Sequence, residues 1–195
     1  MGAIIKLNKP EQKSSMSLEH AIAIRRSRRN FLSEALTFEQ IGQLCWAAQG
    51  LDAKTGYRTA PSAGATYPLE LFIVSDMGLF RYSPDEHTLE KLQEQDLRSA
   101  LASTAWGQKF IKTAPLSLVF TADFSRTTNH YGKRGIRYVY MEAGHAAQNV
   151  YLQAESMGLG AVAIGAFEDA FVSKALSLPS ELEPVYIVTV GYYKK

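Results

Sequence analysis

Three mostly apolar runs of seven or eight residues set the main constraint on how this chain can fold. They are LELFIVS at 69–75, PLSLVFTA at 115–122 and VYIVTVGY at 185–192. Runs of this length and composition are typical of buried strands. The segments between them carry helical patterns, but strands and helices do not alternate regularly as βαβ units require. The sequence therefore predicts an α+β fold and not a doubly wound parallel sheet.

Helical patterns account for most of the remaining chain. Ser17 is a good N-cap for an amphipathic helix that starts at Leu18. Thr37 and Gln40 form the capping box of a second helix, which Gly50 closes. Further elements are expected as follows: helices at 96–112, at 138–157 with Gly158 as the C-cap, and at 168–178; strands at 78–84 and, as a short strand or extended turn, at 161–167; and the start of a polar connection at 89–92.

Composition and length favour one globular domain. The chain has 195 residues, of which 46% are hydrophobic and 21% charged. We expect an extended arm over residues 1–16 and a single domain over residues 17–195. The single cysteine, Cys45, excludes an intramolecular disulfide framework and lies on a predicted core stripe, where a thiol is inert. No apolar stretch approaches the ~20 residues of a membrane span, and the N-terminus has no secretory signal. We therefore expect a soluble cytoplasmic protein.

The segment RRSRRNF at 25–31 concentrates four arginines and a serine in five positions. The net charge of the chain is only +2, so this positive charge is local, and local charge favours a small anion over nucleic acid. If the helix that follows Ser17 continued this far, Arg25 and Arg29 would extend its buried stripe. A buried guanidinium needs an anionic partner. The alternative is a solvated basic face.

Two segments rich in small residues complete a possible ligand site. They are APSAGATYP at 60–68 and GAVAIGAF at 160–167. Small side chains leave backbone N–H groups open to a closely approaching ligand, and an apolar turn suits a flat ring. Together with phosphate-binding arginines, these segments describe a site for a phosphorylated aromatic cofactor. The alternative is that both segments are ordinary tight packing.

Other known site patterns are absent from the sequence. Residues 158–163 fit the letters G-x-G-x-x-A, but a helix precedes them, so the order of a dinucleotide fingerprint is reversed. The four histidines lack metal-ligand spacing. Glu142 and His145 lie one turn apart without a second copy of the motif, which favours a structural pairing over a metal site. The chain contains no Walker loop and no G-x-S-x-G elbow.

Four segments, in this order, resemble the nitroreductase-like FMN-dependent oxidoreductases, and most closely their azoline-dehydrogenase (SagB-type) branch, including its stand-alone members. The segments are RRSRRNF, APSAGATYPLELFIV, EAGHAAQNVYLQAESMGLG and AVAIGAFED, and the likeness extends from about residue 17 to 192. The resemblance implies an antiparallel-type sheet wrapped by helices and an intertwined homodimer. Two FMN sites would lie at its interface, each built by both chains. The alanine-rich face of the long helix at 138–157 would suit close packing at that interface.

The resemblance also implies which residues contact FMN. The phosphate and ribityl chain would be held by Arg25, Ser27 and Arg29, with Arg26 as a fourth contact. The partner subunit would line the isoalloxazine with its own copies of Pro61, Ser62, Ala63 and Gly64. The flavin edge would lie along Ile164, Gly165 and Ala166, with Gln108 aimed at the ring. A basic C-terminal residue, Lys194 or Lys195, would serve the phosphate.

Tyr131 and His130 are the catalytic candidates. Azoline-oxidising relatives carry a Lys-Tyr pair in the loop that this chain writes as NHYGKRG at 129–135, where the pair is His130-Tyr131. Tyr131 over the flavin could donate a proton or contact the substrate, or it could be a surface loop residue, and His130 could exchange protons. The missing lysine disfavours azoline oxidation.

The expected activity is hydride transfer from NAD(P)H through flavin N5 to a nitro- or quinone-like acceptor, or to an azoline-like substrate. An alternative is a flavin-binding protein with little turnover, which acts in storage, sensing or flavin breakdown. No membrane is expected as a partner, because no apolar stretch is long enough to span one. Nucleic acid is not expected either, because no aromatic stacking array accompanies the basic residues.

Overall fold

The computed structural model describes residues 2–52 and 54–194. The strands are β1 (Ile4–Lys6), β2 (Leu69–Ser75), β3 (Gly78–Ser83), β4 (Thr88–Gln93), β5 (Leu116–Ala122), β6 (Gly160–Ile164) and β7 (Glu183–Gly191). The helices are α1 (Leu18–Ile24), α2 (Phe38–Gln49), α3 (Arg98–Thr104), α4 (Lys109–Thr113), α5 (Phe124–Tyr131), α6 (Arg134–Ser156) and α7 (Asp169–Leu176), with a short 3₁₀ turn η1 (Ala63–Ala65).

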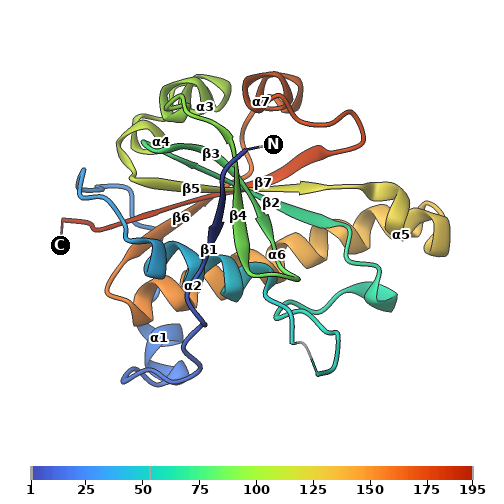
Figure 1. Ribbon diagram of the computed structural model, residues 1–195, viewed down its shortest axis with the longest axis horizontal. Coiled ribbons are helices and arrows are strands. Elements are labelled where there is room, and N and C mark those ends of the chain that lie inside the picture. Colours follow the sequence, from blue (N-terminus) through green and yellow to red (C-terminus); the bar gives the residue numbers. More distant parts are fainter. Residues whose placement is uncertain (1, 53, 195) are drawn as a thin grey trace.

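The sheet is the central layer of the molecule. Its strand order is β1-β4-β3-β2-β5-β7-β6, and each pair of neighbouring strands is antiparallel. Helices α2 and α6 cover one face, while α3, α4 and α7 cover the other (Figure 1). The prediction of an α+β fold with an antiparallel sheet wrapped by helices is therefore confirmed.

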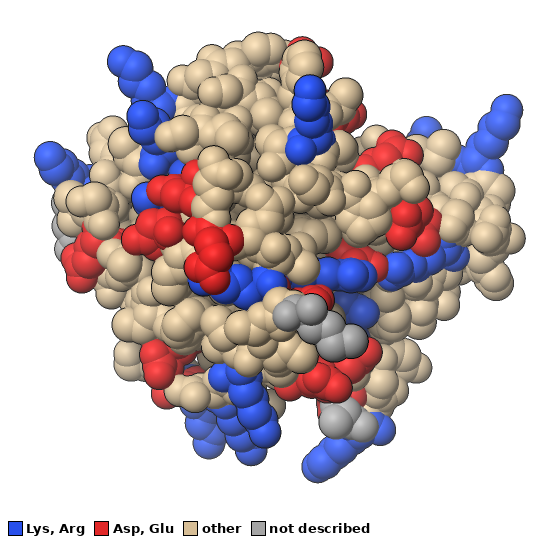
Figure 2. Space-filling model, turned by 45° about the horizontal axis from the view of Figure 1, so that its top comes forward, with Lys and Arg blue, Asp and Glu red and all other residues tan. Residues whose placement is uncertain are grey.

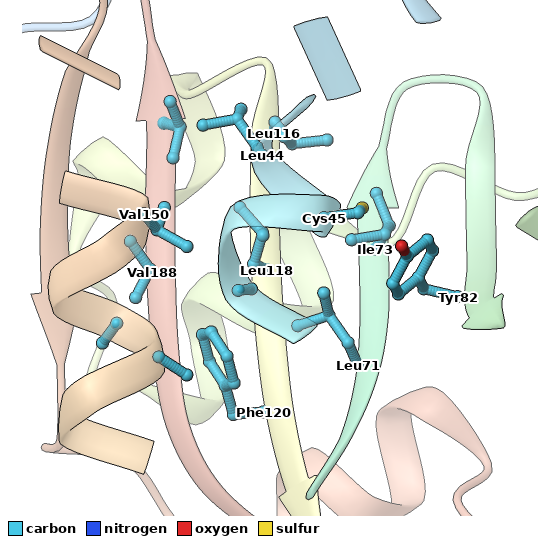
Figure 3. Packing of buried hydrophobic residues seen from close by; sticks show 14 of the residues in the cluster. Leu44, Cys45, Leu71, Ile73, Tyr82, Leu116, Leu118, Phe120, Val150 and Val188 are labelled. Atoms are coloured by element: carbon cyan, nitrogen blue, oxygen red, sulfur yellow. The ribbon is translucent and has the colours of Figure 1, made fainter. Parts of the chain in front are cut away.

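The central strands are buried on both faces, which explains their nearly continuous apolar sequences. In β2, Leu71 and Ile73 belong to the core beneath α2 and α6, whereas Phe72 and Val74 belong to the core on the opposite face. Figure 3 shows the first of these cores, where Cys45 of α2 packs with side chains of β2 and β5. Burial raises the pKa of the Cys45 thiol well above its usual range, so this cysteine is inert as predicted.

The capping box of α2 is confirmed. The Thr37 hydroxyl accepts a hydrogen bond from the Gln40 N–H at 3.3 Å, and the Gln40 Oε1 accepts one from the Thr37 N–H at 3.0 Å. Two of the otherwise unpaired N–H groups at this helix start are thereby satisfied. The same local chemistry places Ser17 as the N-cap of α1, where its hydroxyl accepts from the His20 N–H.

Two predicted elements differ from the structure. The helix expected at 96–112 is split into α3 and α4, because Trp106 and Gly107 adopt left-handed backbone angles (φ 52° and 69°) that cannot continue a right-handed helix. Residues 89–92 are part of strand β4 rather than a connection. Leu89 is fully buried and lies opposite Tyr82 of β3, and this buried contact outweighs the polarity of its neighbours. Residues 4–6 also pair with β4, as the edge strand β1.

Helix α6 begins earlier than predicted, and its alanine-rich face has a different neighbour from the one predicted. It starts at Arg134, and its alanine-rich face packs on this chain's own sheet instead of being free for a second chain. The residues of this face in the core are Ala143, Ala146, Ala147, Val150 and Ala154. The exposed apolar side chains of α6, Ile136, Tyr140 and Met141, lie in its N-terminal half.

Within the described residues, none of the helices combines the length and hydropathy that spanning a bilayer requires.

Candidate active site

The arginine-rich segment is extended, and not helical. Helix α1 ends at Ile24, and Arg25 already has the non-helical angles φ −52° and ψ 124°. Two residues later Ser27 forms a parallel bridge with Ala161 of β6. The prediction that the helix carries Arg25 and Arg29 on a buried stripe is therefore wrong. In an extended backbone, every second side chain points to the same side of the chain. Arg25, Ser27 and Arg29 are two residues apart and therefore share one side of this segment.

Tyr151 of α6 joins this segment to β6. The Arg25 guanidinium lies over the Tyr151 ring, 5.1 Å from its centroid. The Tyr151 Oη is 3.1 Å from the Ser27 Oγ and accepts a hydrogen bond from the Ala163 N–H at 2.7 Å. One buried phenol thus fixes the positions of Arg25, Ser27 and the strand that leads to Ile164.

The other arginines of the segment have separate contacts. Arg29 is exposed and lies 5.8 Å from the Phe110 ring centroid, and Arg28 lies 4.9 Å from that of Tyr193. The Arg26 Nη1 donates to the carbonyls of Ala23 and Arg25, at the end of α1. Among residues 2–52 and 54–194, no carboxylate pairs with any of these four guanidinium groups. Their positive charge is uncompensated, which is the condition for binding an anion.

The end of β6 lies close to Gln108. Gly165 and Ala166 follow the strand and are exposed, and the Gln108 Nε2 donates to the Ala166 carbonyl at 3.3 Å. The C-terminal segment also lies along the arginine segment, since the Lys194 N–H donates to the Asn30 carbonyl at 2.9 Å. Lys195 lies outside the described residues. We call one group of residues the arginine half: Arg25, Ser27, Arg29, Gln108, Ile164, Gly165 and Ala166.

A second group of predicted residues lies elsewhere. Gly64, in η1, has φ 60°, and a Cβ atom there would come within 2.6 Å of the Tyr131 Oη. Glycine is therefore required for the tyrosine to lie against this turn. Tyr131 and His130 form the last turn of α5 and not a loop, which corrects the prediction for residues 129–135. We call the second group the loop half: Pro61, Ser62, Ala63, Gly64, His130 and Tyr131.

The two halves lie at different positions along α6. The arginine half contacts Tyr151, and the Arg26 N–H donates to the Glu155 Oε1 at 3.3 Å. The loop half contacts Tyr138, whose ring centroid is 5.2 Å from that of Tyr131, and Glu142. At a rise of 1.5 Å per residue, the contact points are about 14 to 26 Å apart along the helix. In Figure 1, α5 accordingly lies at one end of α6, and α1 lies near its other end.

Neither of two hollows in the surface contains a predicted cofactor residue. A groove of about 810 Å³ lies between the N-terminal arm, α1, α2 and α6, and a smaller hollow of about 390 Å³ lies beside β2, β3 and Arg58.

Glu142 and His145 do not form the predicted structural pair. His145 is exposed, whereas Glu142 is buried, with 3% of its surface accessible. Burial raises the pKa of the Glu142 carboxyl to about 7, a rise that the nearby Ser62 hydroxyl and the Arg58 charge oppose. In the part of the chain that the structure describes, no group of acidic, histidine and cysteine side chains could hold a metal ion.

Sequence reasoning missed the aromatic residues that support the arginines. Tyr151, Phe110 and Tyr193 lie far from 25–29 in sequence and belong to no local motif. Their roles depend on how α4, α6 and the C-terminus come together in the fold. The one usable signal was the presence of Tyr151 inside the third of the four resembling segments.

Comparison with known proteins identifies the family. The model of the nitroreductase family matches residues 22–192. A protein of Methanocaldococcus jannaschii that carries the provisional name of nitroreductase is 39% identical over 197 residues, which cover 98% of each chain. A crystal structure of a protein from Ralstonia eutropha, also provisionally named a nitroreductase, superimposes with a TM-score of 0.89 at 34% identity, covering 98% of this chain and 90% of that one.

Two relatives with more specific names are more distant. The microcin B17-processing protein McbC of Escherichia coli is 28% identical over 62% of this chain and 48% of its own length. The FMN reductase [NAD(P)H] of Bacillus subtilis is 26% identical over 86% of this chain and 62% of its own length. This chain thus spans about half to three fifths of these two relatives.

The chain therefore belongs to the nitroreductase family. Family membership makes it an oxidoreductase that depends on FMN. The arginine half fits this cofactor: two guanidinium groups without a carboxylate partner suit its phosphate, and the small exposed residues after β6 leave backbone open to its ring.

Replacing Glu142 by glutamine should change how stability depends on pH. A carboxyl whose pKa is raised in the folded state adds stability below the unfolded value of 4.5 and loses it as pH rises through about 7. At roughly 1.4 kcal/mol per pKa unit, the full loss corresponds to about 3 kcal/mol. We expect Glu142→Gln to gain about this much relative to wild type between pH 4.5 and pH 8, as measured by urea unfolding. His145→Gln is the control, and a constant difference between Glu142→Gln and wild type would contradict the assignment.

Proposed function

We propose that this protein takes a hydride from NAD(P)H and delivers it, through FMN, to a small nitro- or quinone-like acceptor. The observation that carries the proposal is the set of guanidinium groups at Arg25 and Arg29, which pair with no carboxylate among the described residues and belong to a segment that runs beside β6. When bound, FMN supplies hydride acceptance and donation at N5. The residues of this chain bind it, orient it and shield it from water.

Each predicted contact has a distinct task in this proposal. Arg25 and Arg29 neutralise the phosphate dianion, and Ser27 adds a hydroxyl on the same side of the extended segment. The backbone of Gly165 and Ala166 lies along the ring edge, held in place by Gln108. Arg26 supports this arrangement from the end of α1, where it caps free carbonyls.

The two halves of the site would meet in a homodimer. In one chain they are separated along α6, so the loop half of one subunit would complete the arginine half of its partner. The N-terminal half of α6 supports this proposal, because Ile136, Tyr140 and Met141 expose 45%, 54% and 51% of their surfaces there. A group of exposed apolar side chains on the helix that connects both halves is typical of an interface.

Tyr131 is proposed to contact the substrate above the flavin ring. Its Oη lies against Gly64, so the phenol and the small-residue turn form one surface. A phenol at this position can hydrogen-bond an acceptor oxygen and supply its proton. His130 packs edge-on against the same ring, with centroids 4.5 Å apart, and is exposed to solvent, from which it can replace that proton.

We place the chain in the azoline-dehydrogenase branch of the family. The four resembling segments support this assignment, as does the similarity to the microcin B17-processing protein. Because His130 replaces the lysine of azoline-oxidising relatives, we favour nitro- and quinone-like acceptors over peptide azolines.

A flavin-binding protein with little turnover is the second candidate. It would need the same arginine half, and the substrate contacts at Tyr131 would be idle. Nucleic-acid binding is not favoured, because on the face that Figure 2 draws the basic side chains are interspersed with acidic ones instead of forming one patch.

Absorption spectroscopy of the purified protein tests the proposed reaction. We expect flavin bands between roughly 350 and 500 nm that bleach under anaerobic conditions on addition of NADH or NADPH and return when a quinone is added. Bands that neither nucleotide bleaches would overturn the reductase and favour the binding protein. A colourless protein that also fails to take up added FMN would overturn both.

Substitution of the two arginines tests the phosphate contact. Each charged hydrogen bond contributes about 1.5 to 3 kcal/mol, so Arg25→Ala and Arg29→Ala should each weaken FMN binding by roughly 10- to 150-fold. The measurement is a titration of flavin fluorescence, with circular dichroism to confirm the fold. Lys174→Ala, which removes an exposed charge from α7, is the matched control. Wild-type affinity in both arginine variants would contradict the assignment.

A further inference from the structure

Tyr151 is a buried phenol next to the exposed arginine segment. Only 8% of its surface is accessible, whereas Ser27, which it contacts, is exposed. Its Oη lies 3.1 Å from the Ser27 Oγ and 2.7 Å from the backbone nitrogen of Ala163 in β6. A buried phenol needs hydrogen-bond partners, and these two contacts meet that need. The direction of the two bonds decides what the Ser27 hydroxyl can offer to a ligand.

The bond between Ala163 and Tyr151 can run in one direction only. A backbone N–H donates and cannot accept, so the Tyr151 Oη is the acceptor. The phenol still has its own hydrogen, and the other hydrogen bond of its Oη is the one with Ser27. If Ser27 donated in that bond, the phenol hydrogen would lack an acceptor in a buried position, which is costly. Tyr151 therefore donates to the Ser27 Oγ.

A serine oxygen that accepts from the phenol has its own hydrogen left to donate. Ser27 shares one side of the extended segment with Arg25 and Arg29, whose guanidinium groups can only donate. This side therefore presents hydrogen-bond donors at three alternate positions. Such a surface suits a ligand that only accepts, and a phosphate dianion is a ligand of this kind.

We propose that Tyr151 is a positioning residue that makes the Ser27 hydroxyl a hydrogen-bond donor and thereby favours FMN over flavins that lack a phosphate. The inference rests on the proposed function, because it requires that Ser27 faces the FMN phosphate. Tyr151 acts through Ser27 and does not touch the cofactor: its Oη is used by Ser27 and Ala163, and its ring lies under the Arg25 guanidinium.

The two observed hydrogen bonds and the proposed one form a chain from the sheet to the ligand. The chain begins at the Ala163 N–H, passes through the Tyr151 phenol and ends with the Ser27 hydroxyl. In such a chain, each hydroxyl is a stronger donor because its oxygen accepts a hydrogen bond. Ala163 directly precedes Ile164 at the end of β6, so the chain also connects the phosphate end of the site to the ring end.

The variant Tyr151→Phe isolates the role of the phenol hydroxyl. It keeps the ring that lies under Arg25 and removes the donor to Ser27. The Ser27 hydroxyl is then no longer held as a donor, so the variant should bind FMN about three- to tenfold more weakly than wild type. Riboflavin has the same ring and ribityl chain but no phosphate, and it should bind equally well to both proteins.

The variant Ser27→Ala removes the proposed donor itself. It should bind FMN about tenfold more weakly, or weaker still, with riboflavin binding unchanged. The double variant of Tyr151→Phe and Ser27→Ala should bind FMN no more weakly than Ser27→Ala, because the phenol then has no hydroxyl to orient. Tyr192→Phe is the matched control. It removes a phenol that accepts a hydrogen bond from the Gln40 Nε2 at 2.9 Å, and both affinities should stay unchanged.

Titrations followed by flavin fluorescence give the affinity of each variant for FMN and for riboflavin, and thermal unfolding gives its stability. Tyr151→Phe leaves the Ala163 N–H without its partner, so a loss of stability is expected whether or not Tyr151 orients Ser27. The ratio of the two affinities is therefore the deciding quantity, because a purely structural role would weaken both flavins alike.

The outcomes separate this inference from the proposed function. If Tyr151→Phe weakens FMN and riboflavin equally, or keeps the wild-type preference for FMN, the inference is overturned while the FMN site stands. A double variant that adds the two single losses would also overturn it, because Tyr151 would then not act through Ser27. If Tyr151→Phe does not fold, Ser27→Ala decides at an exposed position, and an unchanged preference for FMN overturns the inference. If wild type binds neither flavin, the proposed function and the inference both fail.

Discussion

The structure depends on the close packing of α6 against the sheet. Alanines at four positions let this helix of 23 residues approach β6 and β7, so its backbone becomes a rigid axis through the subunit. Both halves of the candidate site contact it, one through Tyr151 and one through Tyr138. The separation between the halves is therefore fixed by the helix rise and not by loop flexibility. In the proposed homodimer, a second chain related by symmetry brings the missing half to each site.

The pattern of apolar residues predicted the central strands and the helices that cover them, but it did not predict the strands near one edge of the sheet. The double-sided burial of β2, β5 and β7 gave continuous apolar runs, and the capping box at Thr37 located α2 from side-chain chemistry alone. Strand β4, which lies next to the edge strand β1, was missed because most of its side chains are polar. The break at Trp106 was missed because a tryptophan with left-handed backbone angles has no sequence signal.

The candidate site shows the same division. Arg25 and Arg29 were grouped on one side by a helical period, and the structure groups them by an extended one; the two periods coincide at a spacing of four residues, although the backbone differs. Ser27 was expected beside them only from the family resemblance. The aromatic supports Tyr151, Phe110 and Tyr193 could not be predicted, because they reach the arginines only through tertiary packing. The alanine-rich face of α6 was assigned to the wrong neighbour, since small residues allow close packing on a sheet as readily as on a partner helix.

Subunit complementation tests most directly whether two chains build each site. One chain would carry Arg25→Ala and Arg29→Ala, and the other Gly64→Val, which drives a side chain into Tyr131. With different tags on the two chains, the mixed dimer can be purified and its bound FMN measured. If each site combines the arginine half of one subunit with the loop half of the other, the mixed dimer has one intact site and should hold about half the wild-type FMN, while each parent dimer holds almost none. A mixed dimer as empty as its parents would contradict the account.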